Sequence, residues 1–157
     1  MRVGVLSDTH GNLPLEAAAA FQGCGHIIHA GDVGGPSLLL ELEEIAPVTA
    51  VLGNNDFSLV NVLKRHEQIE LGGVRFLIAH RLEEIDYLLS TWQTGRVLPH
   101  VCIFGHTHVP DDFRRNPGGI RMINPGALYG PRRGSKKSAL LLEVSNSSIA
   151  QATFISP

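Results

Sequence analysis

The sequence predicts an α/β sandwich, in which two packed β-sheets are flanked by helices. In the first two thirds of the chain, short apolar runs alternate with helical segments, a pattern typical of βαβ units and a largely parallel sheet. In the last third, strand-like runs follow one another with turn residues between them, which indicates antiparallel pairing. At 157 residues the chain suits a single domain, residues 1–157, that buries roughly 70% of its unfolded surface.

Five apolar runs are expected to be strands, and each stops at a polar residue or a glycine. A short apolar run bounded by turn residues is typical of a buried strand. The expected strands cover residues 3–6, 27–28, 48–52, 74–79 and 101–104.

The segments beside these runs predict three helices. Residues 13–21 are rich in alanine, a good helix former, and Gly23 or Gly25 could end this helix. Residues 36–44 begin with a proline, which suits the first helical turn, and carry a leucine face. Residues 83–92 place apolar side chains at the spacing of one helical face: Ile85, Leu88, Leu89 and Trp92.

Four further strands are expected in the last third of the chain. An Asn-Pro-Gly-Gly turn at 116–119 and an Asn-Ser turn at 146–147 separate neighbouring pairs of them. A parallel half followed by an antiparallel half indicates two sheets packed together. The expected strands cover residues 113–115, 120–123, 138–144 and 148–155.

The composition excludes several classes of protein. The 13 basic and 15 acidic residues give a net charge of −2 and form no basic stripe, so a nucleic-acid duplex is not an expected partner. The one dense positive cluster is by default a solvated loop, although it could meet a phosphate: Arg132, Arg133, Lys136 and Lys137. The two cysteines form no disulfide framework or CxxC pair. Without a signal peptide or a membrane-spanning run, we expect a soluble cytoplasmic protein with no membrane partner, and its oligomeric state stays open.

The polar residues at the strand ends carry the strongest functional signal. In open α/β sheets, ligands bind outside the carboxyl ends of the strands. Asp8 and His10 share their spacing with His106 and His108, so each pair should face one side of an extended chain, about 7 Å apart. The full candidate set offers nitrogen and oxygen donors: Asp8, His10, Asp32, Asn54, His80, His106 and His108.

This donor set contains no thiolate, so it favours divalent Mn, Fe, Zn, Co or Ni over a cysteine-rich structural zinc site. One carboxylate between two ions, with a shared water made hydroxide-like at neutral pH, is a recurring device for hydrolysing phosphate esters. Taken alone, each residue has a simpler explanation, since Asp8 or Asp32 could cap a helix or a turn. Such separate explanations do not account for five runs that all end in a metal-competent residue. The other histidines are expected to be structural: His26, His29, His66 and His100.

Five motifs in order along the chain closely resemble those of the calcineurin-like metallophosphoesterases: Asp8-Thr9-His10-Gly11, Gly31-Asp32, Gly53-Asn54, His80 and Gly105-His106-Thr107-His108. The short chain and an Asn124-Pro125-Gly126 stretch followed by Pro131-Arg132 resemble the small bacterial and archaeal phosphodiesterase branch. The resemblance implies a four-layer α/β/β/α sandwich of two packed mixed β-sheets flanked by helices.

The resemblance also implies the ligand sets and the chemistry. One ion would be held by Asp8, His10, Asp32 and His108, and the other by Asp32, Asn54, His80 and His106, so that Asp32 bridges the two. A metal-bridging hydroxide would then attack in line at the phosphorus of a small phosphate diester or nucleotide. Manganese is the first expectation for the two divalent ions, with Fe, Zn, Ni or Co as alternatives.

Three positions depart from the family pattern. Many relatives have His where Asn55 stands, and an amide can donate to phosphate but cannot act as a general acid. We expect Asn55 and Asp32 to be the catalytic residues. Because Asn55 replaces His, the enzyme is expected to be slower or to favour good leaving groups, although the phosphodiesterase branch often lacks that His as well. Arg81 replaces Gly after His80 and is expected to alter the loop or to bind substrate phosphate with Asn55. Ala127 replaces a common Ser, which removes one hydrogen bond.

Two other functions stay open from the sequence. The same fold serves as a non-catalytic interaction scaffold in the retromer coat of eukaryotes, although scaffold members tend to lose ligands that this chain retains. A phosphomonoesterase or protein phosphatase could use the same site, but the chain is short for the loops that build a peptide groove.

Overall fold

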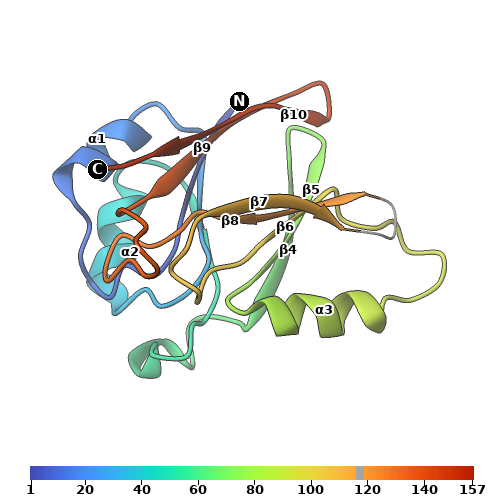
Figure 1. Ribbon diagram of the computed structural model, residues 1–157, viewed down its shortest axis with the longest axis horizontal. Helices are drawn as coiled ribbons and strands as arrows, with labels where there is room; N and C mark the ends of the chain where they lie inside the picture. Colours follow the sequence, from blue (N-terminus) through green and yellow to red (C-terminus); the bar gives the residue numbers. More distant parts are fainter. Residues whose placement is uncertain (116–118) are drawn as a thin grey trace.

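Two five-stranded sheets organise the protein, whose computed structural model describes residues 1–115 and 119–157 (Figure 1). The first sheet has the strand order β10-β9-β1-β2-β3 and contains β1 (Arg2–Leu6), β2 (His26–His29), β3 (Val48–Ala50), β9 (Ala139–Ser145) and β10 (Ser148–Ile155). The second has the order β4-β5-β6-β8-β7 and contains β4 (His66–Leu71), β5 (Val74–Ala79), β6 (Val101–Ile103), β7 (Asp111–Arg115) and β8 (Ile120–Asn124).

The helices in the described part of the chain are short. They are α1 (Leu15–Phe21), α2 (Pro36–Glu43) and α3 (Leu82–Ser90), with a 3-10 helix η1 (Phe57–Leu59), and the three α-helices match the expected ones to within two residues at each end. Gly23, at φ 79°, follows the end of α1 in the left-handed conformation that commonly stops a helix. In the residues that the structure describes, no helix combines the length and the apolar character needed to cross a membrane.

The membership of the sheets differs from the expected division into a parallel and an antiparallel half. β1 pairs in parallel with β2 and antiparallel with β9, and β8 pairs in parallel with β6 and antiparallel with β7, so both sheets are mixed. The reason is that β1 is buried on both faces and pairs along both edges, which brings the C-terminal hairpin β9–β10 back to the N-terminal strand.

Other local predictions were incomplete. The edge strand β4 was missed, although the two glycines at 72–73 that join it to β5 are a typical hairpin signal. The helix η1 was also missed, and β3 ends at Ala50 rather than at residue 52. The turn at 146–147 is confirmed by positive φ angles of 50° and 56°, whereas residues 116–118 of the other expected turn lie outside the described residues.

Alternation along the strands sends neighbouring side chains into different cores. Ile28 and Ile78 lie in the core between the two sheets. Ile27 packs with residues of α1 and α2, and Leu77 packs with Ile85 of α3. Figure 1 shows α1 and α2 on one side of the sheets and α3 on the opposite side. The layers therefore run helices, sheet, sheet, helix, which confirms the predicted four-layer sandwich.

The contact between Gly4 of β1 and the buried ring of Phe21 gives a test of this packing. A Cβ at Gly4 would lie 2.9 Å from Phe21 Cδ1, so Gly4→Ala should cost about 1–3 kcal/mol of unfolding free energy. In a Phe21→Ala background the opposing ring atoms are gone, and most of this cost should disappear. Urea unfolding of the four proteins of the double-mutant cycle measures the coupling, and additive costs to within about 0.5 kcal/mol would contradict the contact.

Candidate metal centre

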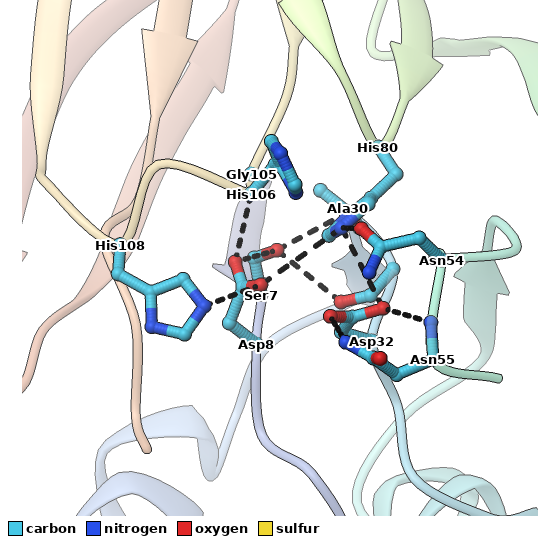
Figure 2. A network of polar contacts seen from close by, with 12 residues as sticks. Ser7, Asp8, Ala30, Asp32, Asn54, Asn55, His80, Gly105, His106 and His108 are labelled. Carbon is cyan, nitrogen blue, oxygen red and sulfur yellow. Dashed lines mark hydrogen bonds and ion pairs between the residues drawn. The ribbon is translucent and has the colours of Figure 1, made fainter. Parts of the chain in front are cut away.

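Loops at the carboxyl ends of strands from both sheets bring the candidate side chains together. Figure 2 shows the carboxylates of Asp8 and Asp32 between His108 on one side and Asn54 and Asn55 on the other. The first sheet supplies Asp8 and His10 after β1, Asp32 after β2 and Asn54 after β3, and the second sheet supplies His80 after β5 and His106 and His108 after β6. The site therefore lies where the two sheets meet.

Two triads of possible ligand atoms share Asp8. Asp8, His10 and His108 form one triad and Asp8, Asp32 and His80 the other, each with its ligand atoms within 4.8 Å of one another. His108 Nε2 lies 3.1 Å from Asp8 Oδ1, and His80 Nε2 lies 3.5 Å from Asp32 Oδ1. Donors that each lie about 2.0–2.2 Å from one ion are roughly 3–4 Å apart, so these spacings suit a first-row divalent ion.

The remaining candidates lie at the edges of these triads. Asn54 Oδ1 is 3.1 Å from His80 Nε2. The His106 ring lies beside that of His80, with 5.2 Å between the ring centroids, but belongs to neither triad. His10 Nε2 is 3.7 Å from Asp32 Oδ2. Both carboxylates thus lie between the two groups of ligands, and the bridging role of Asp32 alone stays a prediction.

A left-handed backbone at the site replaces the extended one assumed from the sequence. The φ angles of five candidate ligands are positive: Asp8 at 53°, His10 at 47°, Asp32 at 54°, His106 at 67° and His108 at 60°. The expected extended chain at these pairs is therefore wrong, although Asp8 and His10 do bring their ligand atoms to one triad. His108 lies against Asp8 while His106 lies against His80. Non-glycine residues adopt this conformation rarely, at a cost of about 1–3 kcal/mol each, so the surrounding contacts must hold it.

Two imidazoles are oriented by hydrogen bonds from their second nitrogen. His80 Nδ1 lies 2.8 Å from the Ala30 carbonyl, and His108 Nδ1 lies 2.6 Å from the Gly130 carbonyl. Because a carbonyl can only accept, Nδ1 carries the proton in both rings. In the neutral form Nε2 then presents its lone pair to the carboxylates, which is the arrangement of a metal-binding histidine.

One buried oxygen at the centre lacks a hydrogen bond. Asp8 is fully buried, and its Oδ1 receives no hydrogen bond from the described residues. Its Oδ2 accepts from Ser7 Oγ at 2.7 Å and from the His106 N–H at 3.0 Å. Burial raises the pKa of the Asp8 carboxyl, but His108, His80 and the hydrogen bond from Ser7 together outweigh burial and bring this pKa below its usual value. A bare, ionised oxygen facing two imidazoles fits a cation, since unsatisfied buried charges are costly.

Asn55 holds the second carboxylate. Its backbone N–H donates to Asp32 Oδ1 at 2.9 Å, and its side-chain Nδ2 donates to Asp32 Oδ2 at 2.6 Å. This is a contact that the sequence did not predict for Asn55. The side-chain amide has a second N–H, so the predicted donation to phosphate is compatible with it.

Arg81 lies beside the centre at the start of α3. Its N–H donates to Glu84 Oε2 at 3.3 Å. With Asn54 and His80 it lines a cavity of about 330 Å³. The predicted contact of Arg81 with substrate phosphate is therefore sterically open and stays a prediction.

Two glycines permit the close approach of the loops. A Cβ at Gly53 would overlap the backbone N and the carboxylate of Asp32. A Cβ at Gly105 would overlap Ser7 Oγ and lie 2.8 Å from Asp8 Oδ2. The glycines before Asn54 and His106 are thus required by space at the two carboxylates.

Residues that fix the loops were mostly missed from the sequence. Asp56, which is buried, accepts from the N–H groups of Gly34 and Gly53 at 2.8 Å each and so joins two ligand loops. Asn124 Nδ2 donates to the Gly105 carbonyl at 2.9 Å and to Thr107 Oγ1 at 3.0 Å, which gives the Asn-Pro-Gly stretch a structural role. A carboxylate directly after the Gly-Asn-Asn turn was the available signal for Asp56.

His29 lies behind the centre, in agreement with its expected structural role. Its Nδ1 accepts from the Gly31 N–H at 3.2 Å, and its Nε2 lies 2.9 Å from Thr9 Oγ1. Complete burial lowers the pKa of His29 to about 4, so it stays neutral. This neutral ring links the loop after β1 to the loop after β2.

Comparison with known proteins assigns the family. The calcineurin-like phosphoesterase superfamily domain matches residues 1–147. The chain belongs to this superfamily.

Curated relatives and solved structures agree with this assignment. A probable metallophosphoesterase of Methanothermobacter thermautotrophicus is 35% identical over 142 residues, which cover 84% of this chain and 80% of that protein. Phosphodiesterase MJ0936 of Methanocaldococcus jannaschii is 28% identical over 147 residues, which cover 83% of this chain and 86% of that protein. The crystal structure of Entamoeba histolytica Vps29 complexed with zinc has a TM-score of 0.75 at 20% identity, covers 99% of this chain and 97% of its own, and so shares the fold.

The stabilising effect of Mn²⁺ should increase with pH. The close contact of His108 Nε2 with the Asp8 carboxylate favours the protonated ring and raises the pKa of His108, and a protonated imidazole cannot bind a cation. Without metal, this raised pKa stabilises the fold fully below about pH 6.5, and the contribution is lost as pH rises through the folded value. With metal, binding strengthens over the same range, and at a hundredfold excess over Kd it adds about 2.7 kcal/mol.

Melting temperatures at about pH 6 and pH 8, with Mn²⁺ or with EDTA, measure this difference. A larger increment at the higher pH is expected. In His108→Gln, which cannot titrate, the pH dependence of the increment should be smaller. An equal increment at both pH values in the wild type would contradict the role of His108.

Proposed function

We propose that this protein is a phosphodiesterase that hydrolyses a small phosphate diester with two divalent ions. The observation that carries the proposal is the pair of buried carboxylates, Asp8 and Asp32, with an unsatisfied oxygen facing the imidazoles of His80 and His108. Membership in the superfamily and a relative named as a phosphodiesterase support the reaction class. Manganese is our first expectation for the ions, with Fe, Zn, Ni or Co as alternatives, because carboxylate, amide and imidazole donors without thiolate suit this group of divalent ions.

The residues of the chain have distinct roles in this proposal. When bound, the ions supply Lewis acidity toward the phosphate oxygens and activate the attacking water. Asp8 and Asp32 supply the negative charge that holds the ions, with the ligand sets that the resemblance implies. Asn55 orients Asp32 and offers its second amide hydrogen to a phosphate oxygen. Arg81 offers a guanidinium to the same phosphate from the cavity beside His80.

Loss of one ligand should abolish metal-dependent cleavage. We expect Asp32→Ala and His106→Ala to lower Mn²⁺-stimulated hydrolysis of bis(p-nitrophenyl) phosphate by roughly a hundredfold or more, since even partners of metal ligands commonly account for tenfold to a hundredfold. His66→Gln is a matched control, because His66 is exposed and belongs to neither triad. Retention of wild-type rates in Asp32→Ala would sink the mechanism.

The same assay separates the competing functions. A non-catalytic scaffold would bind Mn²⁺ but stay inert toward a broad panel of phosphate esters. A phosphomonoesterase would strongly prefer p-nitrophenyl phosphate to its bis-ester, and that preference would overturn the assignment as a diesterase.

Asn55 should make the reaction sensitive to the leaving group. Because an amide cannot protonate the leaving oxygen, kcat/KM should fall steeply across aryl diesters as the pKa of the leaving phenol rises. Asn55→His should flatten this dependence. The substitution should raise kcat/KM for the ester with the poorest leaving group by roughly a hundredfold more than for the ester with the best one. Asn55→Ala is the control, because it loses the contact to Asp32 without gaining an acid and should slow all esters alike. An unchanged slope in Asn55→His would refute the role.

A further inference from the structure

Two cavities adjoin the metal centre. The Phe57 cavity, of about 330 Å³, is lined by Asn54 and His80 and by the apolar side chains of Phe57 and Val60. Its lining also includes Arg65, which is paired with Glu84, and Arg81, which the proposed function assigns to the reacting phosphate. Phe57 and Val60 are 79% and 54% exposed, so they offer an apolar surface next to the ligands.

The second cavity, which we call the Arg132 cavity, is about 480 Å³ in volume and includes His106, Thr107, Arg132 and Arg133 in its lining. Each cavity therefore contains one of two candidate ligands, His80 and His106, whose rings are neighbours. A phosphate bound at the centre has access to both cavities. A monoester has one substituent to place, whereas a diester has two.

The Arg132 cavity is positively charged in a protein of net charge −2. Arg132 and Arg133 are exposed, and neither takes part in an ion pair among the described residues. Lys136 and Lys137, also exposed, follow on the same loop. Asp111 also lines the cavity, so the lining has two arginines and one carboxylate, and positive charge predominates.

The arginine loop is fastened to the metal centre. The Arg132 N–H donates to the His108 carbonyl at 3.3 Å, and Ser135 Oγ donates to the same carbonyl at 3.1 Å. These bonds fix the backbone of the arginine loop beside a candidate ligand. Unpaired arginines at the wall of a cavity are suited to bind a phosphate or carboxylate, because their planar guanidinium groups donate two parallel hydrogen bonds.

We propose that the substrate is a phosphodiester that carries a second anionic group, with that group in the Arg132 cavity and the other substituent in the Phe57 cavity. The inference rests on the proposed phosphodiesterase function and names its substrate class. The volume of the Arg132 cavity lies within the roughly 300–1,000 Å³ typical of small-molecule sites and accommodates a phosphorylated substituent.

Two thymidine esters form a matched pair of probes. One is thymidine 5′-(p-nitrophenyl phosphate), and the other is the same ester with an additional 3′-phosphate. In both, the oxygen of water forms a new bond to phosphorus while the bond to p-nitrophenolate breaks with its electron pair, which releases a proton. The leaving group is identical, so a difference in kcat/KM reports on the added charge.

The wild-type protein with Mn²⁺ should favour the 3′-phosphorylated ester by roughly tenfold, mainly through a lower KM. In Arg133→Gln and in Arg132→Gln this ratio should fall toward one. Because each ratio is taken within one protein, a general loss of activity does not affect it. Arg96→Gln is the control for net charge, because Arg96 is exposed, lines neither cavity and should leave the ratio unchanged.

Calorimetry gives a readout independent of turnover. Metal-loaded protein should bind thymidine 3′,5′-bisphosphate roughly tenfold more tightly than thymidine 5′-monophosphate, and Arg133→Gln should lose the difference. An equal rate for the two esters, or a preference that survives in both arginine variants, would overturn the inference while leaving the phosphodiesterase in place. Failure to cleave either ester or bis(p-nitrophenyl) phosphate would instead remove the proposed function.

Discussion

The burial of two carboxylates next to each other is the constraint on which the site depends. Asp8 and Asp32 are 0% and 2% exposed. The effective cost of burying such charges is several kcal/mol per ion unless partners compensate it. Hydrogen bonds from Ser7 and the His106 backbone act on one carboxylate, and those from Asn55 act on the other. These donors leave Asp8 Oδ1 without a hydrogen bond, and a cation is the natural complement of that oxygen.

Backbone strain follows from the same constraint. To turn their side chains toward a shared centre directly after a strand, five candidate ligands take positive φ angles. Ladder-like bonds continue past the strand ends and hold this conformation, with the Asp8 N–H on the Gly31 carbonyl and the Gly105 N–H on the His80 carbonyl, both at 3.0 Å. Strain and buried charge are therefore concentrated in the same few residues, as is common where function sets the geometry.

The sequence contained the positions of the site but not its geometry. The spacing of apolar residues and the composition located the three α-helices and all strands but β4, because each of these segments has its own set of apolar side chains to bury. The pairing of β9 with β1 could not be inferred, since it joins residues far apart in the chain and depends on which edge remains free. The side-chain contacts of Asn55 and Asp56 were hidden for a similar reason, because both hold loops that become neighbours only after the sheets pack.

The seam between the sheets explains why the centre requires the whole sandwich. Asp8 and Asp32 lie in loops that follow strands of the first sheet. His80 directly follows β5 of the second sheet, and His108 lies in the loop after β6 of the same sheet. The distance from His108 Nε2 to Asp8 Oδ1, 3.1 Å, is therefore set by the core between the sheets rather than by any local turn. Cations bound between the two sheets would connect one sheet to the other. Metal affinity and the stability of the central core should therefore be thermodynamically linked, so that a change in one alters the other.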